Sequence, residues 1–205
     1  MKKQTLFMIG LATLLASATQ ASQEQLAQSI RDAHVETTRT SEQLKATLSA
    51  ITALTKQKSG DLRPAYNTYC AEVAKTEGAA TWTRTRVQWM GSDGRQYFQN
   101  WQTTVSAIAN ESLRKKSQKR LDAVQASYNK VEASLKTAGD KFKPFLSDLG
   151  DIQKALAADV TPGGVKAVSS TVRSANWNHQ FVDKAIQAAL KEMDKMQKAL
   201  SSEAK

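Results

Sequence analysis

The stretch TWTRTRVQWMGSDGR, residues 81–95, could form either a β-hairpin or part of a long helix. Residues 81–90 alternate in a way that is typical of a β-strand, and Gly-Ser-Asp-Gly would suit a hairpin loop. The same stretch also continues a series of apolar and small residues spaced alternately three and four positions apart, as on one face of a helix. The series is Leu62, Tyr66, Tyr69, Val73, Thr76, Ala80, Thr83, Val87, Met90, Gly94, Tyr97, Trp101, Thr104 and Ile108. Fourteen positions in one phase would not cross a hairpin by chance, so we predict a helix.

Three further series with this spacing lie along the chain. They run over residues 26–54, 117–156 and 165–200. Turn residues separate them: Gly60 is a typical helix stop, Asn110 suits a helix start, and Thr161 precedes Pro-Gly-Gly. The predicted helices cover about residues 22–58, 62–108, 111–158 and 164–202.

These four helices predict an all-α fold. Short turns favour antiparallel neighbours, so we expect an elongated antiparallel four-helix bundle or coiled coil formed by a single domain over residues 22–205. The second and third helices are the longer pair, and at about 1.5 Å per residue their hairpin should project roughly 15 Å beyond the others. Residues 98–120 form this projecting end, here called the hairpin tip. Pro144 lies inside the third helix, which either continues through it or splits between residues 139 and 140.

The first 21 residues are typical of a secretory signal peptide. Lys2 and Lys3 precede an apolar run of about ten residues and a small-residue end, with cleavage readable after Ala18 or Ala21. The run is too short for a stable membrane helix, and no comparable run follows. We therefore expect a soluble protein of the periplasm with no transmembrane helix after signal cleavage.

The net charge indicates which classes of partner the chain could bind. Removal of Lys2 and Lys3 lowers the formal net charge from +10 to +8, which still favours anionic partners. Nucleic acid is not expected for an exported protein, whereas an envelope protein, anionic lipid or polysaccharide is. The single cysteine, Cys70, excludes an internal disulfide framework, so Cys70 is a small buried side chain, a free reactive thiol or part of an intermolecular bridge.

The hairpin tip carries the densest run of positive charge in the chain. Five cations fall within seven residues: Arg114, Lys115, Lys116, Lys119 and Arg120. Such a run is either a solvated helix face or a docking site for an anionic surface or acidic protein.

A second candidate lies in the opening stretch. Trp82 and Trp89 fall one heptad apart at the edge of the core series, with Arg86 between them. The rings either cover a groove against a neighbouring helix or meet a lipid headgroup layer or partner. Gly91 and Gly94 each weaken a helix by about 1 kcal/mol relative to alanine, which predicts a hinge below the hairpin tip.

The sequence offers little for catalysis or metal binding. His34 and His179 are expected far apart, and the sequence contains no Glu-x-x-His or His-x-x-x-His pair. No Gly-rich phosphate loop or nucleophile elbow is present. We therefore predict no enzyme activity, no cofactor and no metal site.

Two segments carry a resemblance to a known family. These are FQNWQTTVSAIANESLRKKSQKRLDAVQASYNKVEASLKTAGDKFKPFLSDL, residues 98–149, and HVETTRTSEQLKATLSAITALTKQKSGDLRPAYN, residues 34–67. With their Gly-Asp-Leu before Tyr66, Phe98 and Trp101, and Asn110 followed by Leu-Arg, they resemble domain of unknown function family 2959. The resemblance implies an exported α-helical protein of Gram-negative bacteria and brings no established activity. Members often look like lipoproteins; the lipid-bearing cysteine is absent here, which favours a free periplasmic protein.

These expectations favour a non-enzymatic helical scaffold or adaptor that binds an anionic envelope surface or protein partner through the hairpin tip. The alternative is a holdase-type chaperone that grips unfolded clients between helical arms. A long helix with an uncovered apolar stripe also suits a homodimer.

Overall fold

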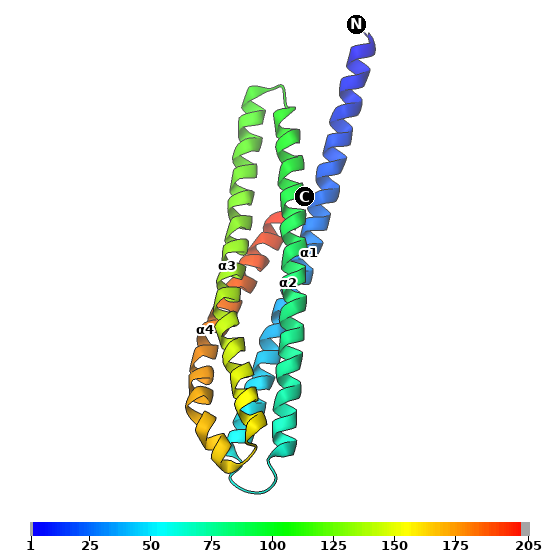
Figure 1. Cartoon of the computed structure of the whole chain (residues 1–205). Coiled ribbons are helices and arrows are strands. Elements are labelled where there is room, and N and C mark those ends of the chain that lie inside the picture. Colours follow the sequence, from blue (N-terminus) through cyan, green and yellow to red (C-terminus); the bar gives the residue numbers. More distant parts are fainter. Residues whose placement is uncertain (1, 202–205) are drawn as a thin grey trace. The chain divides into compact units, whose positions relative to one another are not determined.

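The computed structural model describes the backbone of residues 2–201 and the side chains of residues 17–201. Four helices account for nearly all of this part of the chain (Figure 1). They are α1 (Lys2–Lys56), α2 (Arg63–Ser106), α3 (Glu111–Ala158) and α4 (Pro162–Ser201). No strand occurs between residues 2 and 201. The prediction of an all-α bundle is therefore confirmed, and residues 81–95 are helical.

The helix bounds differ from the predicted ones mainly at the beginning of the chain. The backbone of α1 is already helical from Lys2, whereas the predicted first helix began at residue 22. The side chains of residues 1–16, which carry most of the predicted signal peptide, lie outside the described residues. The signal peptide thus stays a prediction. The third helix has the predicted bounds and continues through Pro144, so it is not split after residue 139.

Side-chain packing divides the chain into two compact units. The first unit holds Met1–His34, Arg86–Ala133 and Lys191–Lys205, and the second holds Val35–Thr85 and Ser134–Leu190. Each unit therefore contains a segment of all four helices.

Hydrogen bonds define the helix directions in the second unit. Thr47 Oγ1 lies 2.8 Å from Thr76 Oγ1, and Thr40 Oγ1 lies 2.9 Å from Thr83 Oγ1, so the segments of α1 and α2 run antiparallel. The Tyr69 hydroxyl donates to the Leu149 carbonyl at 2.7 Å and joins α2 to α3. The buried apolar side chains come from the predicted series and include Leu44, Ile51, Leu54, Val73, Phe145, Leu149, Ile152, Val172, Val182 and Ile186.

An aromatic cluster packs the first unit. The ring centroid of Phe98 lies 5.1 Å from that of Tyr97 and 5.4 Å from that of Tyr128. The Tyr128 hydroxyl donates to the Met90 carbonyl at 2.9 Å, which ties α3 to α2. Leu26 and Ile30 of α1 and Met193, Met196 and Leu200 of α4 complete this core.

Polar side chains in the turns cap the N-termini of α2 and α3. Gly60 has a φ of 85°, a conformation that favours glycine, and Asp61 Oδ1 accepts a hydrogen bond from the Arg63 amide at 3.0 Å. Asn110 Oδ1 accepts from the Leu113 amide at 3.0 Å, as expected of an N-cap. The predicted helix starts therefore rest on capping side chains.

Candidate functional site

Hydrogen bonds at the end of α2 and across the short connection to α3 stabilise the hairpin tip. The carbonyls of Thr103, Thr104 and Val105 accept the last backbone hydrogen bonds of α2. The Arg114 guanidinium then reaches back from α3 and donates through Nη1 to the Ile108 carbonyl at 3.0 Å. Because this contact satisfies a carbonyl of the connection, it holds one cation at the very end of the hairpin.

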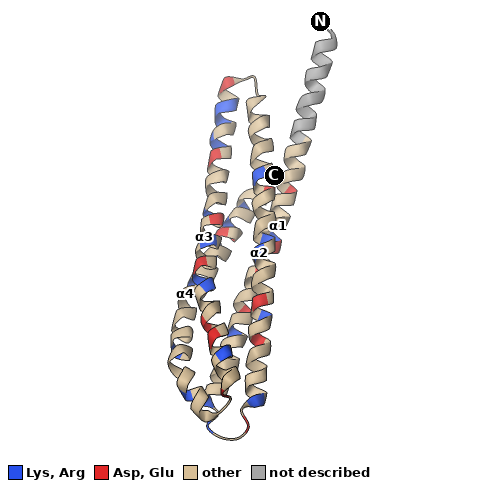
Figure 2. Ribbon diagram, viewed as in Figure 1, with Lys and Arg blue, Asp and Glu red and all other residues tan. Residues whose placement is uncertain are grey.

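The five cations of the hairpin tip are all exposed. Lys115 forms an ion pair of 2.7 Å with Glu111, one turn away on the same helix. Lys116 and Lys119 form no ion pair within residues 17–201. The nearby Asp122 accepts a hydrogen bond from Gln118 at 2.9 Å. Figure 2 shows the basic residues gathered where α3 begins. Five cations against Glu111 and Asp122 leave the hairpin tip strongly positive.

The hairpin tip extends past the level at which α4 ends. Near that level Gln23 Nε2 donates to the Leu200 carbonyl at 2.8 Å, and Asn100 Nδ2 donates to Ser22 Oγ at 3.2 Å. α2 continues for six residues beyond Asn100, to Ser106. At about 1.5 Å per residue this adds roughly 9 Å of helix. Within the first unit the hairpin tip therefore projects past α4 by less than the predicted 15 Å. The prediction that it also projects past the first helix is wrong, because Thr19 of α1 lies 2.9 Å from Thr104 and α1 is already helical from Lys2.

An exposed leucine lies among the cations. The side chain of Leu113 is 54% exposed, and Ile108 of the connection is half-buried. Helical spacing in the sequence did not predict that Leu113 is exposed. Leu113 lies three residues after the N-cap, at the end of the α2–α3 hairpin, where few neighbouring side chains can cover it. This position could have indicated its exposure.

Arg86 and Trp89 lie together in the first unit. The Arg86 guanidinium carbon lies 4.8 Å from the centre of the Trp89 ring, and Arg86 Nη1 lies 3.3 Å from Asp32 Oδ2. The charge of Arg86 therefore already has two partners. Trp89 is 51% exposed, and Trp82, in the second unit, is 59% exposed. Neither ring is buried in a groove, so both stay candidates for an interface.

The two glycines of α2 differ in their surroundings. A Cβ at Gly91 would lie 3.7 Å from Arg95 Nη1, which is ordinary contact. A Cβ at Gly94 would lie 2.8 Å from Tyr128 Cε1 and closer still to the end of the ring. Gly94 therefore has a packing reason to be glycine, and α2 is helical through both residues. Their role as a hinge stays a prediction.

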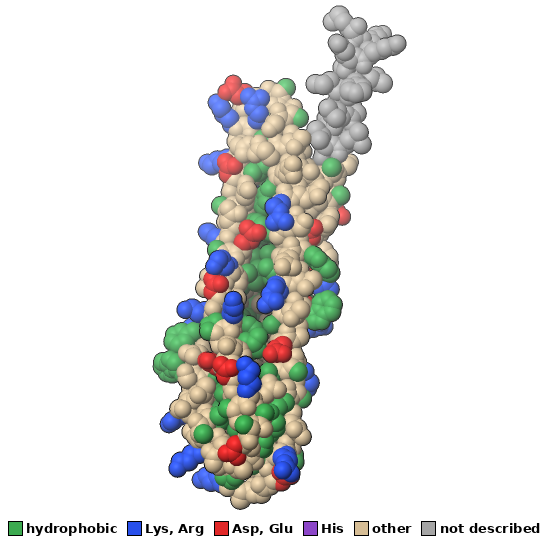
Figure 3. Space-filling view, viewed as in Figure 1, with side chains coloured by type: hydrophobic (Ala, Val, Ile, Leu, Met, Phe, Trp, Pro, Cys, Tyr) green, Lys and Arg blue, Asp and Glu red, His purple; other side chains and the backbone are tan. Residues whose placement is uncertain are grey.

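Sequence reasoning missed an aromatic pair on α4 in the second unit. Trp177 is 62% exposed and Phe181 is 47% exposed, and their rings meet edge to face with centroids 6.1 Å apart. Figure 3 shows hydrophobic side chains on the surface over α4. The signal was their spacing of four residues, outside the core series.

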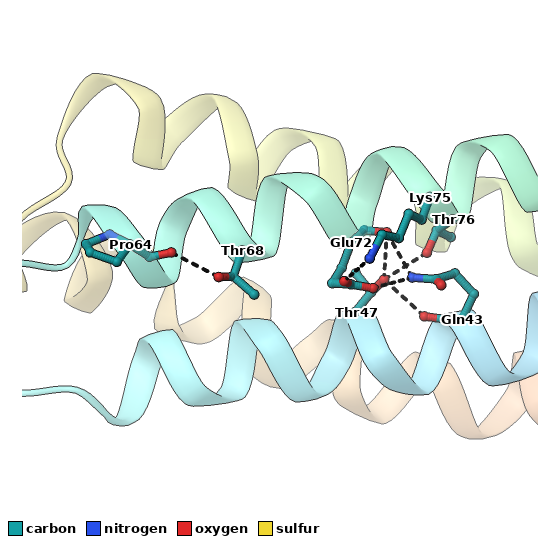
Figure 4. Close-up of polar contacts among 7 residues, drawn as sticks. All are labelled: Gln43, Thr47, Pro64, Thr68, Glu72, Lys75 and Thr76. Atoms are coloured by element: carbon teal, nitrogen blue, oxygen red, sulfur yellow. Dashed lines mark hydrogen bonds and ion pairs between the residues drawn. The ribbon is translucent and has the colours of Figure 1, made fainter.

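Polar side chains of α1 and α2 form a hydrogen-bonded network in the second unit (Figure 4). Thr47 Oγ1 lies 3.0 Å from the Glu72 carbonyl and contacts Thr76. Gln43 Nε2 and Lys75 Nζ each donate to the Glu72 carboxylate at 2.6 Å, and these bonds lower the pKa of Glu72, that of Lys75 most. Every member has a partner, so the network holds helices together and offers no vacant ligand position.

The groups that could act chemically are dispersed. His34 Nε2 lies 3.3 Å from Asp194 Oδ1 in the first unit. In the second unit His179 Nε2 is buried without a hydrogen-bond partner, and burial lowers the pKa of this imidazole. Tyr66 lies beside Cys70; a hydrogen bond to that side chain and burial raise the pKa of Tyr66 to about 12. Within the described residues no three His, Cys, Asp or Glu side chains form a metal-binding group.

Together these features define a class of protein: an all-α bundle whose most concentrated charge lies at the end of an α2–α3 hairpin. No helix in the described part of the chain is long and apolar enough to cross a membrane. The model of a family described as protein of unknown function, DUF2959, matches residues 16–200. The chain belongs to this family, and the resemblance seen in the sequence is confirmed. No curated protein matches the chain.

Proposed function

We propose that this protein is a non-enzymatic scaffold or adaptor of the periplasm that binds an anionic envelope surface or an acidic partner through its hairpin tip. The observation that carries the proposal is the pair of exposed lysines, Lys116 and Lys119, that have no ion pair within the described residues. They lie beside Arg114 and Arg120 on one end of a helical hairpin.

This arrangement does not serve folding. Like charges within one helix turn repel each other, and each such pair destabilises a helix by a few tenths of a kcal/mol. The one acid in the first turn of α3, Glu111, pairs with Lys115. Lys116 and Lys119, which have no ion pair within the described residues, therefore cost stability in the free protein, and a bound anion would offset this cost.

The proposed compartment rests on the amino-terminal sequence. The basic head, apolar run and small-residue end of residues 1–21 support export through a cleavable signal peptide. A single cysteine suits an exported chain that is held by packing alone. In the periplasm the available anions are lipid headgroups, polysaccharides and acidic proteins.

The test is capture of partners from envelope extract by two variants of equal charge. In the tip variant the five cations of the hairpin tip are changed to Gln. In the control variant five exposed cations of the second unit are changed to Gln: Lys141, Lys143, Lys166, Arg173 and Lys184. We expect the tip variant to lose bound partners and the control variant to keep them. Equal capture by both would contradict the proposal, because net charge rather than the hairpin tip would then govern binding.

One observation favours a holdase as a second candidate. The exposed Trp177–Phe181 pair offers an apolar contact of the kind that binds unfolded chains. A holdase should suppress aggregation of an unfolding client at stoichiometric ratios, and Trp177→Ser with Phe181→Ser should abolish this. Aggregation that proceeds unchanged in the presence of the unmodified protein removes this candidate.

A further inference from the structure

We propose that the surface bound by the hairpin tip is an anionic lipid bilayer, and that Leu113 inserts among its headgroups while the surrounding cations pair with lipid phosphates. This inference rests on the proposed function and names its partner. It is carried by an exposed leucine inside a cluster of cations at the end of a hairpin.

Leu113 has no role in packing that accounts for it. Its amide is bonded to the Asn110 side chain, which places it in the first turn of α3, and its side chain is 54% exposed. The buried face of α3 begins later, at Leu121. With Ile108 half-buried in the connection, Leu113 makes the apex apolar at its centre.

Two of the cations lie beside this exposed leucine. Arg114 is bonded to the Ile108 carbonyl, so its guanidinium lies at the level of the connection. Lys116 follows Leu113 by three residues, and a residue three positions along a helix lies on the same face. An exposed apolar side chain beside cations matches the interface of an anionic bilayer, where acyl chains lie just beneath phosphates. A polysaccharide would pair with the cations and offer no apolar layer for the leucine.

The exposed leucine favours a bilayer over an acidic protein. An acidic partner would pair with the cations, whereas a bilayer also offers Leu113 an apolar layer to enter. Each cation near an anionic bilayer gains up to about fivefold in affinity, and a buried leucine side chain adds about tenfold or more.

The first residues of α1 whose side chains are described contact the hairpin tip. Thr19 Oγ1 lies 2.9 Å from Thr104 Oγ1, and Asn100 Nδ2 lies 3.5 Å from the Ala18 carbonyl. Both contacts join the predicted cleavage region to the last turns of α2. Signal cleavage after Ala18 or Ala21 would therefore leave the new end of the chain beside the last turns of α2.

The test compares vesicles with a lipid-free anion. The chain without the predicted signal peptide is mixed with vesicles of equal parts phosphatidylglycerol and phosphatidylcholine, with vesicles of phosphatidylcholine alone, and with heparin. We expect binding to the anionic vesicles and to heparin only. Leu113→Ser should weaken vesicle binding about tenfold and leave heparin binding unchanged. Val35→Ser, at another exposed apolar residue, is the matched control and should change neither.

The outcomes separate this inference from the proposed function. If Leu113→Ser binds vesicles as the unmodified chain does, or if only heparin is bound, the lipid inference is wrong while anion binding by the hairpin tip stands. If changing the five cations to Gln leaves heparin binding intact, the proposed function is wrong as well. A direct readout is Leu113→Trp: relative to the unmodified chain, which already holds four tryptophans, this variant should show additional fluorescence quenching by lipids with brominated acyl chains. Absence of quenching in bound protein would overturn insertion.

Discussion

The ring of Tyr128 packs directly on the backbone of Gly94, and its hydroxyl donates to the Met90 carbonyl one turn earlier in α2. Burial raises the pKa of this phenol well above its usual range. Tyr128 thus occupies the space that a side chain at residue 94 would need, and it joins α3 to α2 in the first unit. The close approach of the two helices here depends on a glycine.

The two glycines of α2 should therefore respond in opposite ways to alanine. Gly94→Ala places a methyl group against the Tyr128 ring, so we expect a loss of about 1–3 kcal/mol in the free energy of unfolding. Gly91→Ala meets no such contact and gains helix propensity, so we expect a stabilisation of up to about 1 kcal/mol. Urea unfolding of both variants measures the difference. Equal stabilisation by both would show that Tyr128 moves aside at no cost.

The same glycines show what sequence reasoning reaches and where it stops. The spacing of the second series predicted an unbroken helix through residues 91–94, and the structure confirms it. Sequence alone treats Gly94 as a weak point, because glycine lowers helix propensity wherever it occurs. That Tyr128, 34 residues away, fills its place depends on the pairing of α2 with α3, which a helical period does not specify.

The hydroxyl pair Thr47–Thr76 should couple α1 to α2 in the second unit. Both side chains are fully buried and lie 2.8 Å apart. Thr47→Val leaves the Thr76 hydroxyl in the core without this partner, at a cost of about 1–3 kcal/mol. Thr76→Val should cost less, because the Thr47 hydroxyl can still donate to the Gln43 or Glu72 carbonyl. The double variant should cost less than the sum of the two, because no hydroxyl is then left unpaired.

A double-mutant cycle of unfolding free energies measures this coupling. Thr68→Val is the control: Thr68 is exposed and bonds only to the Pro64 carbonyl of its own helix, so we expect a change within about 0.5 kcal/mol. Additive effects of the two buried substitutions would show that the pair contributes no energy of its own.

His179 should make stability depend on pH. Burial lowers its pKa below the usual 6.5; Asp183 opposes this effect and Lys45 adds to it, while the ring of Phe145 lies 6.2 Å away. The folded state therefore favours the neutral imidazole. The stabilisation is fully present above pH 6.5 and is lost as pH falls from there through the lowered pKa, because the unfolded chain takes up the proton first.

Denaturation midpoints at several values between pH 8 and pH 5 test this effect. His179→Gln keeps a polar side chain of similar size that does not titrate. Below pH 6.5 the unmodified protein should lose stability faster than the variant, while carboxylates contribute equally to both. Parallel curves would mean that the imidazole is solvated in both states.

Exposure of individual side chains was the least predictable feature. The helical series indicated which residues face the core, and the helix lengths predicted that the five cations lie at the end of the α2–α3 hairpin. Neither indicates how far a neighbouring helix covers residues beside the series. Leu113 and Trp177 are exposed because no neighbouring side chain covers them, and this depends on where the other helices end and how they pack.

The N-cap of α3 should set both stability and the position of the apex cation. Asn110 Oδ1 accepts from the Leu113 amide, and the Asn110 carbonyl accepts from the Arg114 amide at 2.9 Å. Asn110→Ala removes the side-chain acceptor, so we expect a loss of about 1 kcal/mol in the free energy of unfolding. Asn110→Asp keeps an acceptor and favours the helix dipole, so it should preserve stability. Loss of the cap in Asn110→Ala should fray the first turn of α3, which carries Arg114. If the proposed function is correct, this variant should also bind heparin more weakly than Asn110→Ser, which retains a cap and adds no charge. Identical unfolding midpoints for the Ala and Ser variants would show that this first turn of α3 is held by the Arg114 contact with the Ile108 carbonyl rather than by its cap.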